Sequence, residues 1–429
     1  MEDTYVSSEF RAPSQPVANP PRYRQVSIGR PSVEVSEVQG VLHMRSLEPL
    51  AELPSRLLDR LVHWSRVRPE QTFIAARQPG GEWRRVSYAE MLDSVRAIAQ
   101  GLLSYGLSAD KPLALFSGND IEHLQLALGA MYAGIPYCPV SPAYSLLSQD
   151  FAKLRHVCDL LQPGLVFVSD AGAYLRAIDA VLPPDTPLIT VRGQVPGRSQ
   201  TSFATLLEQP GGAEADAAFA ATGPDSIAKF LFTSGSTKLP KAVITTQRML
   251  CANQQMLLQT FPVFGEEPPV LVDWLPWNHT FGGSHNVGIV LYNGGTFYLD
   301  DGKPTAQGFA ETLRNLKEVS PTAYLTVPKG WEELVNALEQ DAELRACFFK
   351  RMSLFFFAAA GLSQSLWDRL DRVAEQHCGE RIRMMAGLGM TEASPSCTFT
   401  TGSLSMAGYI GLPAPGCEVR LVPVDGKLE

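Results

Sequence analysis

The chain has 429 residues, of which 45% are hydrophobic and 19% are charged, and 36 basic residues stand against 44 acidic ones. This length predicts two or three packed subdomains of a globular protein and argues against a fibre. The formal net charge of -8, without a dense run of Lys and Arg, argues against a nucleic-acid partner. The 7 cysteines are scattered, with no CxxC pair, which argues against a disulfide framework or a zinc site.

Two stretches of the chain bear on targeting and membrane insertion. Residues 1–21 are acidic and rich in proline, whereas a signal peptide has a basic start and an apolar run. The longest apolar stretch, residues 124–142, is interrupted by glycine and proline and does not predict a membrane span. We therefore expect a cytoplasmic protein.

The first half of the chain predicts alternating helices and strands. Residues 1–50 are expected to form an N-terminal arm, with a short strand or ribbon where valines alternate at positions 33–41. Helical periodicity at residues 57–62 and 91–102 then alternates with short apolar runs at 113–116 and 165–168, which predicts a mainly parallel α/β sheet. The Pro/Gly/Ala-rich residues 210–224 predict a surface loop, and residues 227–233 predict a fully apolar strand.

The second half predicts another α/β series. Its candidate strands are residues 270–274, 296–299, 323–327 and 353–358, and residues 398–429 are expected to form part of a small β-barrel. The expected fold class is thus α/β, with two stacked, mainly parallel-sheet subdomains and a partial barrel. The expected divisions are residues 1–50, 51–240, 241–397 and 398–429.

Hydroxyls, a glycine and two lysines follow the strand predicted at residues 227–233. The residues are Thr233, Ser234, Gly235, Ser236, Thr237, Lys238 and Lys241. Hydroxyls and backbone N–H groups wrap phosphate oxygens, and Lys238 or Lys241 can supply the opposite charge. The Walker pattern GxxxxGK[ST] is absent. The alternative is a Ser/Thr-rich surface loop that caps the next helix.

A second polar segment places Thr391 and Glu392 after an expected glycine turn that contains Gly387, Leu388, Gly389 and Met390. A carboxylate beside a triphosphate needs a divalent cation between them, so Glu392 is a candidate Mg²⁺ ligand. Thr391 could donate to the α-phosphate. The alternative is a helix N-terminus that Thr391 caps and Glu392 stabilises.

Two apolar segments predict a substrate slot. Residues 274–284 surround His279 with aromatic residues and glycines, so that His279, Phe281, Gly282 and Gly283 could form a flat-walled slot with a polar tip. The alternative for His279 is a hydrogen-bonded core residue. Residues 355–361 predict a buried strand that ends in a small-residue turn, a composition that an ordinary strand-to-helix turn also has.

Together these segments resemble the adenylate-forming superfamily, which includes acyl-CoA synthetases, luciferases and peptide-synthetase adenylation domains. Its phosphate loop has the form Ser/Thr-Ser-Gly-Ser/Thr-Thr-Gly-x-Pro-Lys-Gly, from which Lys238 and Ala242 depart; Leu388 stands where the family has tyrosine. The resemblance implies catalytic roles for Lys241, His279, Thr391 and Glu392. It also implies adenine contacts at Ala360 and Gly361, and acyl contacts at Ala359.

Within the family, residues 274–283 and 293–302 look most like feruloyl-CoA synthetases. The resemblance implies an acid:CoA ligase that uses ATP and Mg²⁺ to convert an aromatic carboxylate, such as ferulate, to an acyl-AMP, and then transfers the acyl group to coenzyme A. Similar enzymes continue beyond the equivalent of residue 429 with a ribose-binding aspartate and a small domain bearing a catalytic lysine. Without that domain, we expect this chain to catalyse poorly.

Three alternatives remain open at this stage. A fatty-acid or other aryl-acid:CoA ligase would share the same segments. A serine hydrolase would use Ser284, where Gly-Gly-Ser-His-Asn approaches the GxSxG nucleophile elbow but ends in Asn. A noncatalytic nucleotide-binding scaffold would keep the fold without the reaction.

Overall fold

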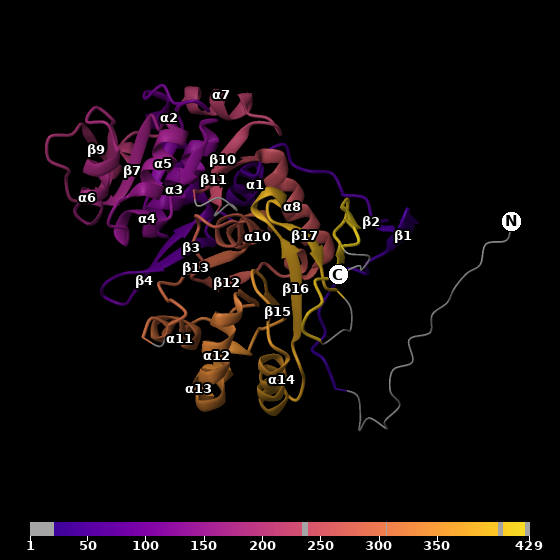
Figure 1. Ribbon diagram of the computed structural model, residues 1–429. Coiled ribbons are helices and arrows are strands. Elements are labelled where there is room, and N and C mark those ends of the chain that lie inside the picture. Colours follow the sequence, from indigo (N-terminus) through magenta and orange to yellow (C-terminus); the bar gives the residue numbers. More distant parts are fainter. Residues whose placement is uncertain (1–20, 234–238, 306, 402–405, 425–429) are drawn as a thin grey trace.

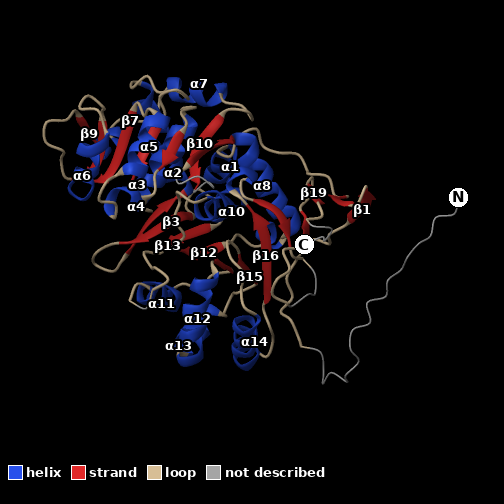
Figure 2. Ribbon diagram, viewed as in Figure 1, coloured by secondary structure: helices blue, strands red, loops and turns tan. Residues whose placement is uncertain are grey.

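The computed structural model describes residues 21–233, 239–305, 307–401 and 406–424. In these ranges the chain forms mixed α/β layers in which helices cover both faces of mainly parallel sheets (Figures 1 and 2). This architecture confirms the predicted fold class. No helix in the described ranges is long and apolar enough to cross a bilayer.

The largest sheet has seven strands in the order β11-β10-β6-β5-β7-β8-β9. All neighbours are parallel except the edge pair β10 and β11, which forms an antiparallel hairpin. Its strands are β5 (Leu113–Phe116), β6 (Tyr137–Pro139), β7 (Leu165–Asp170), β8 (Leu188–Arg192), β9 (Gln200–Ser202), β10 (Ile227–Thr233) and β11 (Lys241–Thr246).

Two further sheets abut one another where Thr322 N donates to Val270 O at 3.0 Å. One has the order β12-β13-β3-β4 and the other β14-β15-β16-β17-β18, and both are parallel except at the β4, β17 and β18 edges. Their strands are β3 (Thr72–Arg77), β4 (Trp83–Ser87), β12 (Val270–Asp273), β13 (Thr296–Leu299), β14 (Ala323–Thr326), β15 (Leu354–Phe357), β16 (Arg383–Gly389), β17 (Ser396–Phe399) and β18 (Leu412–Pro413).

The predicted valine ribbon forms a hairpin of β1 (Val33–Val38) and β2 (Val41–Ser46), and β2 pairs antiparallel with β19 (Glu418–Leu421). The two ends of the described chain therefore share one small sheet. Likewise, β3 and β4 join β13 and β12, although they lie far apart in the chain. Strands from different expected divisions of the sequence thus pair in the same sheet. The divisions themselves stay a prediction.

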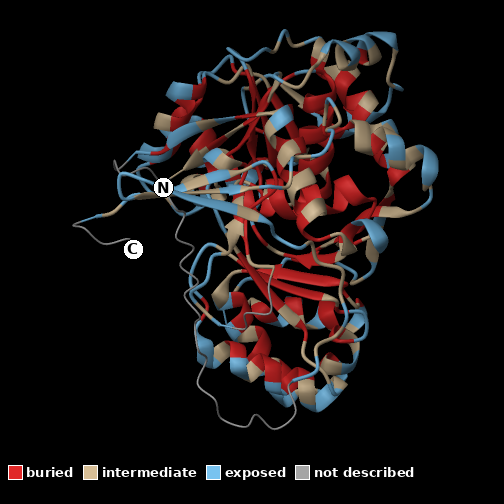
Figure 3. Cartoon of the chain, turned by 90° about the vertical axis from the view of Figure 1, so that its right-hand side faces the viewer, coloured by how far each residue is buried: buried red, intermediate tan, exposed pale blue. Residues whose placement is uncertain are grey.

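Helices fill the spaces between the sheets, and their inner faces are buried while their outer faces are exposed (Figure 3). The Ser87–Glu90 capping box fixes the start of α2, since each side chain bonds the other's backbone N–H. The helices are α1 (Asp59–Val67), α2 (Tyr88–Leu103), α3 (Ile121–Tyr132), α4 (Pro142–Leu146), α5 (Ala152–Leu161), α6 (Ala171–Val181), η1 (Phe203–Leu207), α7 (Ala213–Ala221), α8 (Gln247–Thr260), α9 (Val263–Glu266), η2 (Phe281–Asn286), α10 (Val287–Asn293), α11 (Phe309–Glu318), α12 (Pro328–Gln340), α13 (Ala342–Phe348), α14 (Gln364–Cys378) and η3 (Thr391–Ala393).

The surface loop predicted at residues 210–224 is wrong, because α7 occupies its centre. Between the flanking glycines and prolines the sequence is rich in alanine, the strongest helix former. Tertiary contacts add to this propensity: Asp216 accepts hydrogen bonds from Arg96 at 2.6 and 2.9 Å and from the Tyr132 hydroxyl at 2.8 Å.

The strand predicted at residues 227–233 is confirmed as β10, but its description as fully apolar is wrong because it contains Lys229. The Lys229 side chain is 2% exposed, and its ammonium donates to Gly283 O at 3.0 Å. Desolvation lowers the pKa of Lys229 from 10.5 to about 7. A strand that leads into the site therefore carries a lysine that is hard to protonate.

Replacing Lys229 with Met should make stability less dependent on pH. Between pH 7 and 10.5 the unfolded chain binds a proton at Lys229 that the folded chain does not. Wild-type stability should therefore fall as the pH drops through this range, by roughly 1.4 kcal/mol per unit from this group, and level off below pH 7. Urea unfolding at several pH values measures the difference from Lys229→Met, and exposed Lys350→Met is the control. Parallel profiles of wild type and Lys229→Met would contradict the prediction.

Candidate functional site

A cavity of about 490 Å³ opens at the carboxyl ends of β6 and β10, and we call it the strand-end cavity. Ligands of open α/β sheets commonly bind at such strand ends. Its lining residues are Pro139, Val140, Ser141, Tyr144, Val157, Leu231, Phe232, Thr233, Asn278, His279, Met390, Thr391 and Glu392. Thr233 and Glu392, which come from two distant segments of the sequence, therefore line one space.

A second cavity of about 240 Å³ adjoins the first, and we call it the aromatic slot. His279, Met390 and Thr391 line both cavities. The other lining residues of the slot are Thr280, Phe281, His285, Phe356, Ala358, Ala359, Gly387, Gly389, Pro395 and Ser396. A mixed polar space thus leads past His279 into one walled by the rings of Phe281 and Phe356 together with polar groups.

The centre of the predicted phosphate loop, Ser234 to Lys238, lies outside the described residues. Its two flanks are adjacent, because Thr233 at the end of β10 pairs with Lys241 at the start of β11. His156 on α5 bonds Pro240 O at 2.9 Å and so holds the far flank in place. The residues on either side of this segment are therefore neighbours, and of them Thr233 lines the strand-end cavity while Leu239, Pro240 and Lys241 do not.

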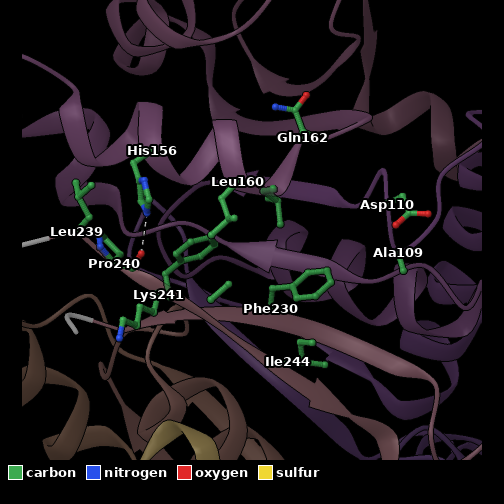
Figure 4. A pocket seen from close by; sticks show the side chains of 13 residues that line it. Ala109, Asp110, His156, Leu160, Gln162, Phe230, Leu239, Pro240, Lys241 and Ile244 are labelled. Atoms are coloured by element: carbon green, nitrogen blue, oxygen red, sulfur yellow. Dashed lines mark hydrogen bonds between the residues drawn. The ribbon is translucent and has the colours of Figure 1, made fainter. Parts of the chain in front are cut away.

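Lys241 is exposed and lines a third, mainly apolar cavity of about 860 Å³ between α5 and the β10–β11 hairpin. In Figure 4 the Lys241 side chain lies at the end of this cavity where Leu239 and Pro240 lie, with Asp110 at the other end. Lys241 does not line the strand-end cavity itself, although its strand partner Thr233 does.

Thr391 and Glu392 lie in the short helix η3 after β16. The prediction of a glycine turn at residues 387–389 is wrong, because these residues form the end of strand β16. Thr391 is not a helix cap, since Met390 precedes the helix and makes no side-chain cap bond. Asn253 on α8 holds this turn through its amide nitrogen, which donates to Ser396 O at 2.9 Å. The Glu392 carboxylate is exposed to the strand-end cavity.

His279 lies where the two cavities meet, with its side chain accessible to solvent. The Phe281 N–H donates to His279 Nδ1 at 3.3 Å, so Nδ1 carries a lone pair and Nε2 carries the proton of the neutral ring. Desolvation by the surrounding protein lowers the pKa of His279, which favours this neutral form. His279 can therefore donate a hydrogen bond to an anionic oxygen without carrying a charge.

Gly282 and Gly283 line neither the strand-end cavity nor the slot. A Cβ on Gly282 would lie 2.6 Å from Leu275 O, and one on Gly283 would lie 2.2 Å from Trp277 O. Their lack of side chains therefore lets the π-helical turn η2 pack directly on the backbone of residues 275–277. The predicted role of both glycines in binding substrate stays a prediction.

The neighbouring Ser284 is buried inside η2, whereas a nucleophile elbow joins a strand to a helix. His285 Nδ1 bonds Asn286, and no hydrogen bond joins Ser284 Oγ to a histidine in the described part of the chain. This geometry does not favour the serine hydrolase alternative.

The small-residue turn after β15 contributes Ala359 to the slot, and Ala359 has a φ of 73°, which L-residues rarely adopt. Ala360 and Gly361 follow it at the surface. Across the slot, Gly387 and Gly389 line the cavity, while Leu388 between them is 42% exposed and does not. Adenine contacts by Ala360, Gly361 and Leu388 remain a prediction.

Sequence reasoning missed several residues of the site, and three of them matter most for its chemistry. Phe356 and His285 line the slot, and Lys229 bonds the turn that forms it. Phe356 was read only as part of a buried strand. His285 lies six residues after His279 in the same glycine-containing segment, and this proximity was the one signal that could have identified it.

The model of the AMP-binding enzyme family matches residues 61–428. This range covers most of the chain, and the chain therefore belongs to the AMP-binding enzyme family. The adenylate-forming superfamily to which the sequence motifs pointed is thereby confirmed.

Individual relatives are distant. The chain is 26% identical over 424 residues to the peroxisomal long chain acyl-CoA synthetase 7 of Arabidopsis thaliana, covering 86% of this chain and 57% of the relative. It is 24% identical over 352 residues to the luciferin 4-monooxygenase of Photinus pyralis, covering 79% and 60%. The chain thus spans less than two thirds of the length of these relatives.

Solved structures share the fold. The anthranilate CoA ligase AuaEII in complex with anthranoyl-AMP superimposes with a TM-score of 0.70 at 19% identity, covering 89% of this chain and 68% of that one. A benzoate CoA ligase from Burkholderia xenovorans LB400 has a TM-score of 0.66 at 20% identity, covering 84% and 66%.

Replacing Ala359 with Gly should stabilise the fold. An alanine with positive φ is strained by roughly 1–2 kcal/mol, and glycine removes this strain at an entropic cost of about 0.5–1 kcal/mol. We expect the free energy of unfolding of Ala359→Gly to rise by up to about 1 kcal/mol. The matched control is Ala358→Gly, where φ is not positive and the substitution should destabilise. If urea unfolding showed that Ala359→Gly and Ala358→Gly destabilise the fold equally, Ala359 would not be strained.

Proposed function

We propose that this protein is an ATP-dependent acid:CoA ligase that adenylates a compact aromatic carboxylate, of the hydroxycinnamate class that includes ferulate. The observation that carries the proposal is the continuity of the site: a polar cavity lined by Thr233 and Glu392 leads past His279 into an aromatic slot. A nucleotide in the first space and an acid in the second would meet at His279. Membership in the AMP-binding enzyme family supports ATP as the nucleotide.

The strand-end cavity suits a magnesium nucleotide. Phosphates at the end of β10 would contact the loop that starts at Thr233, with Lys238 or Lys241 as the counter-charge and Thr391 as a donor. Mg²⁺ usually takes one or two protein carboxylates and completes its shell with phosphates and water. The exposed carboxylate of Glu392 fits this requirement. Bound Mg²⁺ would neutralise charge as pyrophosphate departs.

The aromatic slot suits an acid with one ring. Phe281 and Phe356 supply flat apolar walls, and the volume of about 240 Å³ is small for a long alkyl chain. The Nε2 proton of His279 would orient the carboxylate at the junction. The structural relatives named for anthranilate and benzoate support an aromatic acid, whereas the plant synthetase supports the fatty-acid alternative.

The proposed reaction has two steps. A carboxylate oxygen attacks the α-phosphorus of ATP, forming the acyl-AMP anhydride and releasing pyrophosphate. The thiol of coenzyme A then attacks the acyl carbon and releases AMP. The residues described here position the reactants and stabilise charge, and no general base is required of them in the first step. A cytoplasmic location belongs to the same proposal.

Acid-dependent exchange of labelled pyrophosphate into ATP tests the proposed function. Single-ring aromatic acids should support faster exchange than long-chain fatty acids, because the slot is short and walled by rings. Thioester formation with coenzyme A should follow the same order of acids. A preference for aliphatic acids would refute the aromatic assignment. If none of the acids supported exchange by the full-length protein, the noncatalytic scaffold would be favoured.

Replacing Glu392 with Gln should lower the exchange rate roughly 100-fold and raise the Mg²⁺ concentration at half-maximal rate, because the amide is a poorer ligand for a hard cation. Exposed Glu52→Gln has the same change of charge and should behave as wild type. An unchanged Mg²⁺ dependence in Glu392→Gln would show that this carboxylate does not hold the metal.

A further inference from the structure

His285 places a free hydrogen-bond acceptor on the wall of the aromatic slot. The side chain is 1% exposed and packs against Phe281 and Phe356, with ring centroids 5.3 Å from each. Its Nε2 atom is buried and has no hydrogen-bond partner in the described part of the chain. A buried polar atom left unpaired costs roughly 1–3 kcal/mol, so a partner delivered by a ligand would remove a penalty.

The hydrogen bonds behind His285 determine which nitrogen carries the proton. Asn286 Nδ2 donates to Asp273 Oδ2 at 2.9 Å and lies 3.5 Å from Leu325 O, a second acceptor. The Asn286 amide therefore presents its oxygen to His285 Nδ1, at 2.8 Å. That oxygen can only accept, so Nδ1 carries the proton and Nε2 carries a lone pair.

The neutral state of the ring follows from its surroundings. Burial lowers the pKa of His285 to about 4, and no charged side chain is hydrogen-bonded to the ring. The Nδ1 edge points to Asn286, which is fully buried and does not line the slot, so the unpaired Nε2 is the remaining polar atom of a ring that does line it.

We infer that His285 determines specificity by accepting a hydrogen bond from a hydroxyl group on the ring of the acid. This inference rests on the proposed function, and it names the substituent that the slot selects. The two histidines of the site then have complementary roles. His279 offers a proton to the carboxylate end of the acid, and His285 offers a lone pair to the hydroxyl at its other end.

The lone pair discriminates between closely related rings. A phenolic hydroxyl donates a hydrogen bond to Nε2, whereas a methyl ether at the same position cannot donate and an unsubstituted ring leaves Nε2 unpaired. Sites that hydrogen-bond a substrate hydroxyl reject analogues that lack it, because the buried protein group then has no partner. Thr280 also lines the slot, and its Oγ1 is a second buried polar atom without a hydrogen-bond partner in the described part of the chain.

The test compares 3- and 4-hydroxycinnamate with cinnamate and 4-methoxycinnamate in the pyrophosphate-exchange assay. For wild type, whichever of the two hydroxycinnamates is used better should have a kcat/KM about 10-fold or more above that of cinnamate and that of 4-methoxycinnamate. His285→Phe should reduce this ratio to near 1, whatever the variant's overall rate. His285→Gln should retain part of the preference, since its terminal oxygen reaches the Nε2 position, whereas the shorter His285→Asn should not.

Each ratio compares acids on the same variant, so loss of folded protein cancels from it. A wild type that does not distinguish the acids, or a His285→Phe variant that keeps the preference, overturns the inference while leaving the ligase activity standing. If no acid supports exchange, the proposed function fails, and calorimetric titration of the same four acids decides the inference by itself. A hydroxyl preference in binding that His285→Phe abolishes would support it, and equal binding of all four acids would overturn it.

Discussion

The site depends on the close backbone contact between residues 275–277 and the glycine pair of η2. Gly282 and Gly283 leave no room for a Cβ against Leu275 O and Trp277 O. This contact folds the segment back on itself, and it brings His279 to the junction of the two cavities and His285 into the slot. A larger residue at either glycine would separate the turn from its support and displace both histidines.

The carbonyl groups of this turn are satisfied by side chains from two other elements. Lys229 on β10 donates to Gly283 O, and Gln254 on α8 donates to Ser284 O at 2.9 Å and to His285 O at 3.3 Å. A π-helical turn departs from regular α-helical bonding, and such turns are frequent at functional sites. The strand that leads into the phosphate loop is therefore bonded directly to the turn that forms the acid slot.

The two cavities of the site differ in the polar groups that line them. The strand-end cavity carries hydroxyls and an exposed carboxylate, which suits a hydrated metal nucleotide. The slot carries rings, glycines and two neutral histidines, which suits a ring whose charge remains at the entrance. Glu392 lines the strand-end cavity and not the slot, and keeping this charge out of the slot avoids the large cost of burying an unpaired ion.

The amino-acid sequence by itself determined most element types and strand positions, the family and the segments that form the site, because periodicity and turn residues are local signals. It also indicated His279, Thr391 and Glu392. Only the tertiary structure decided that Gly282 and Gly283 serve backbone packing and that Lys229 is buried. It alone also showed that α7 forms where a loop was expected and that His285 presents a lone pair to the slot. These properties arise from neighbours distant in the chain, such as Asp273 and Leu325 behind Asn286. No local pattern encodes which atoms such neighbours leave unpaired.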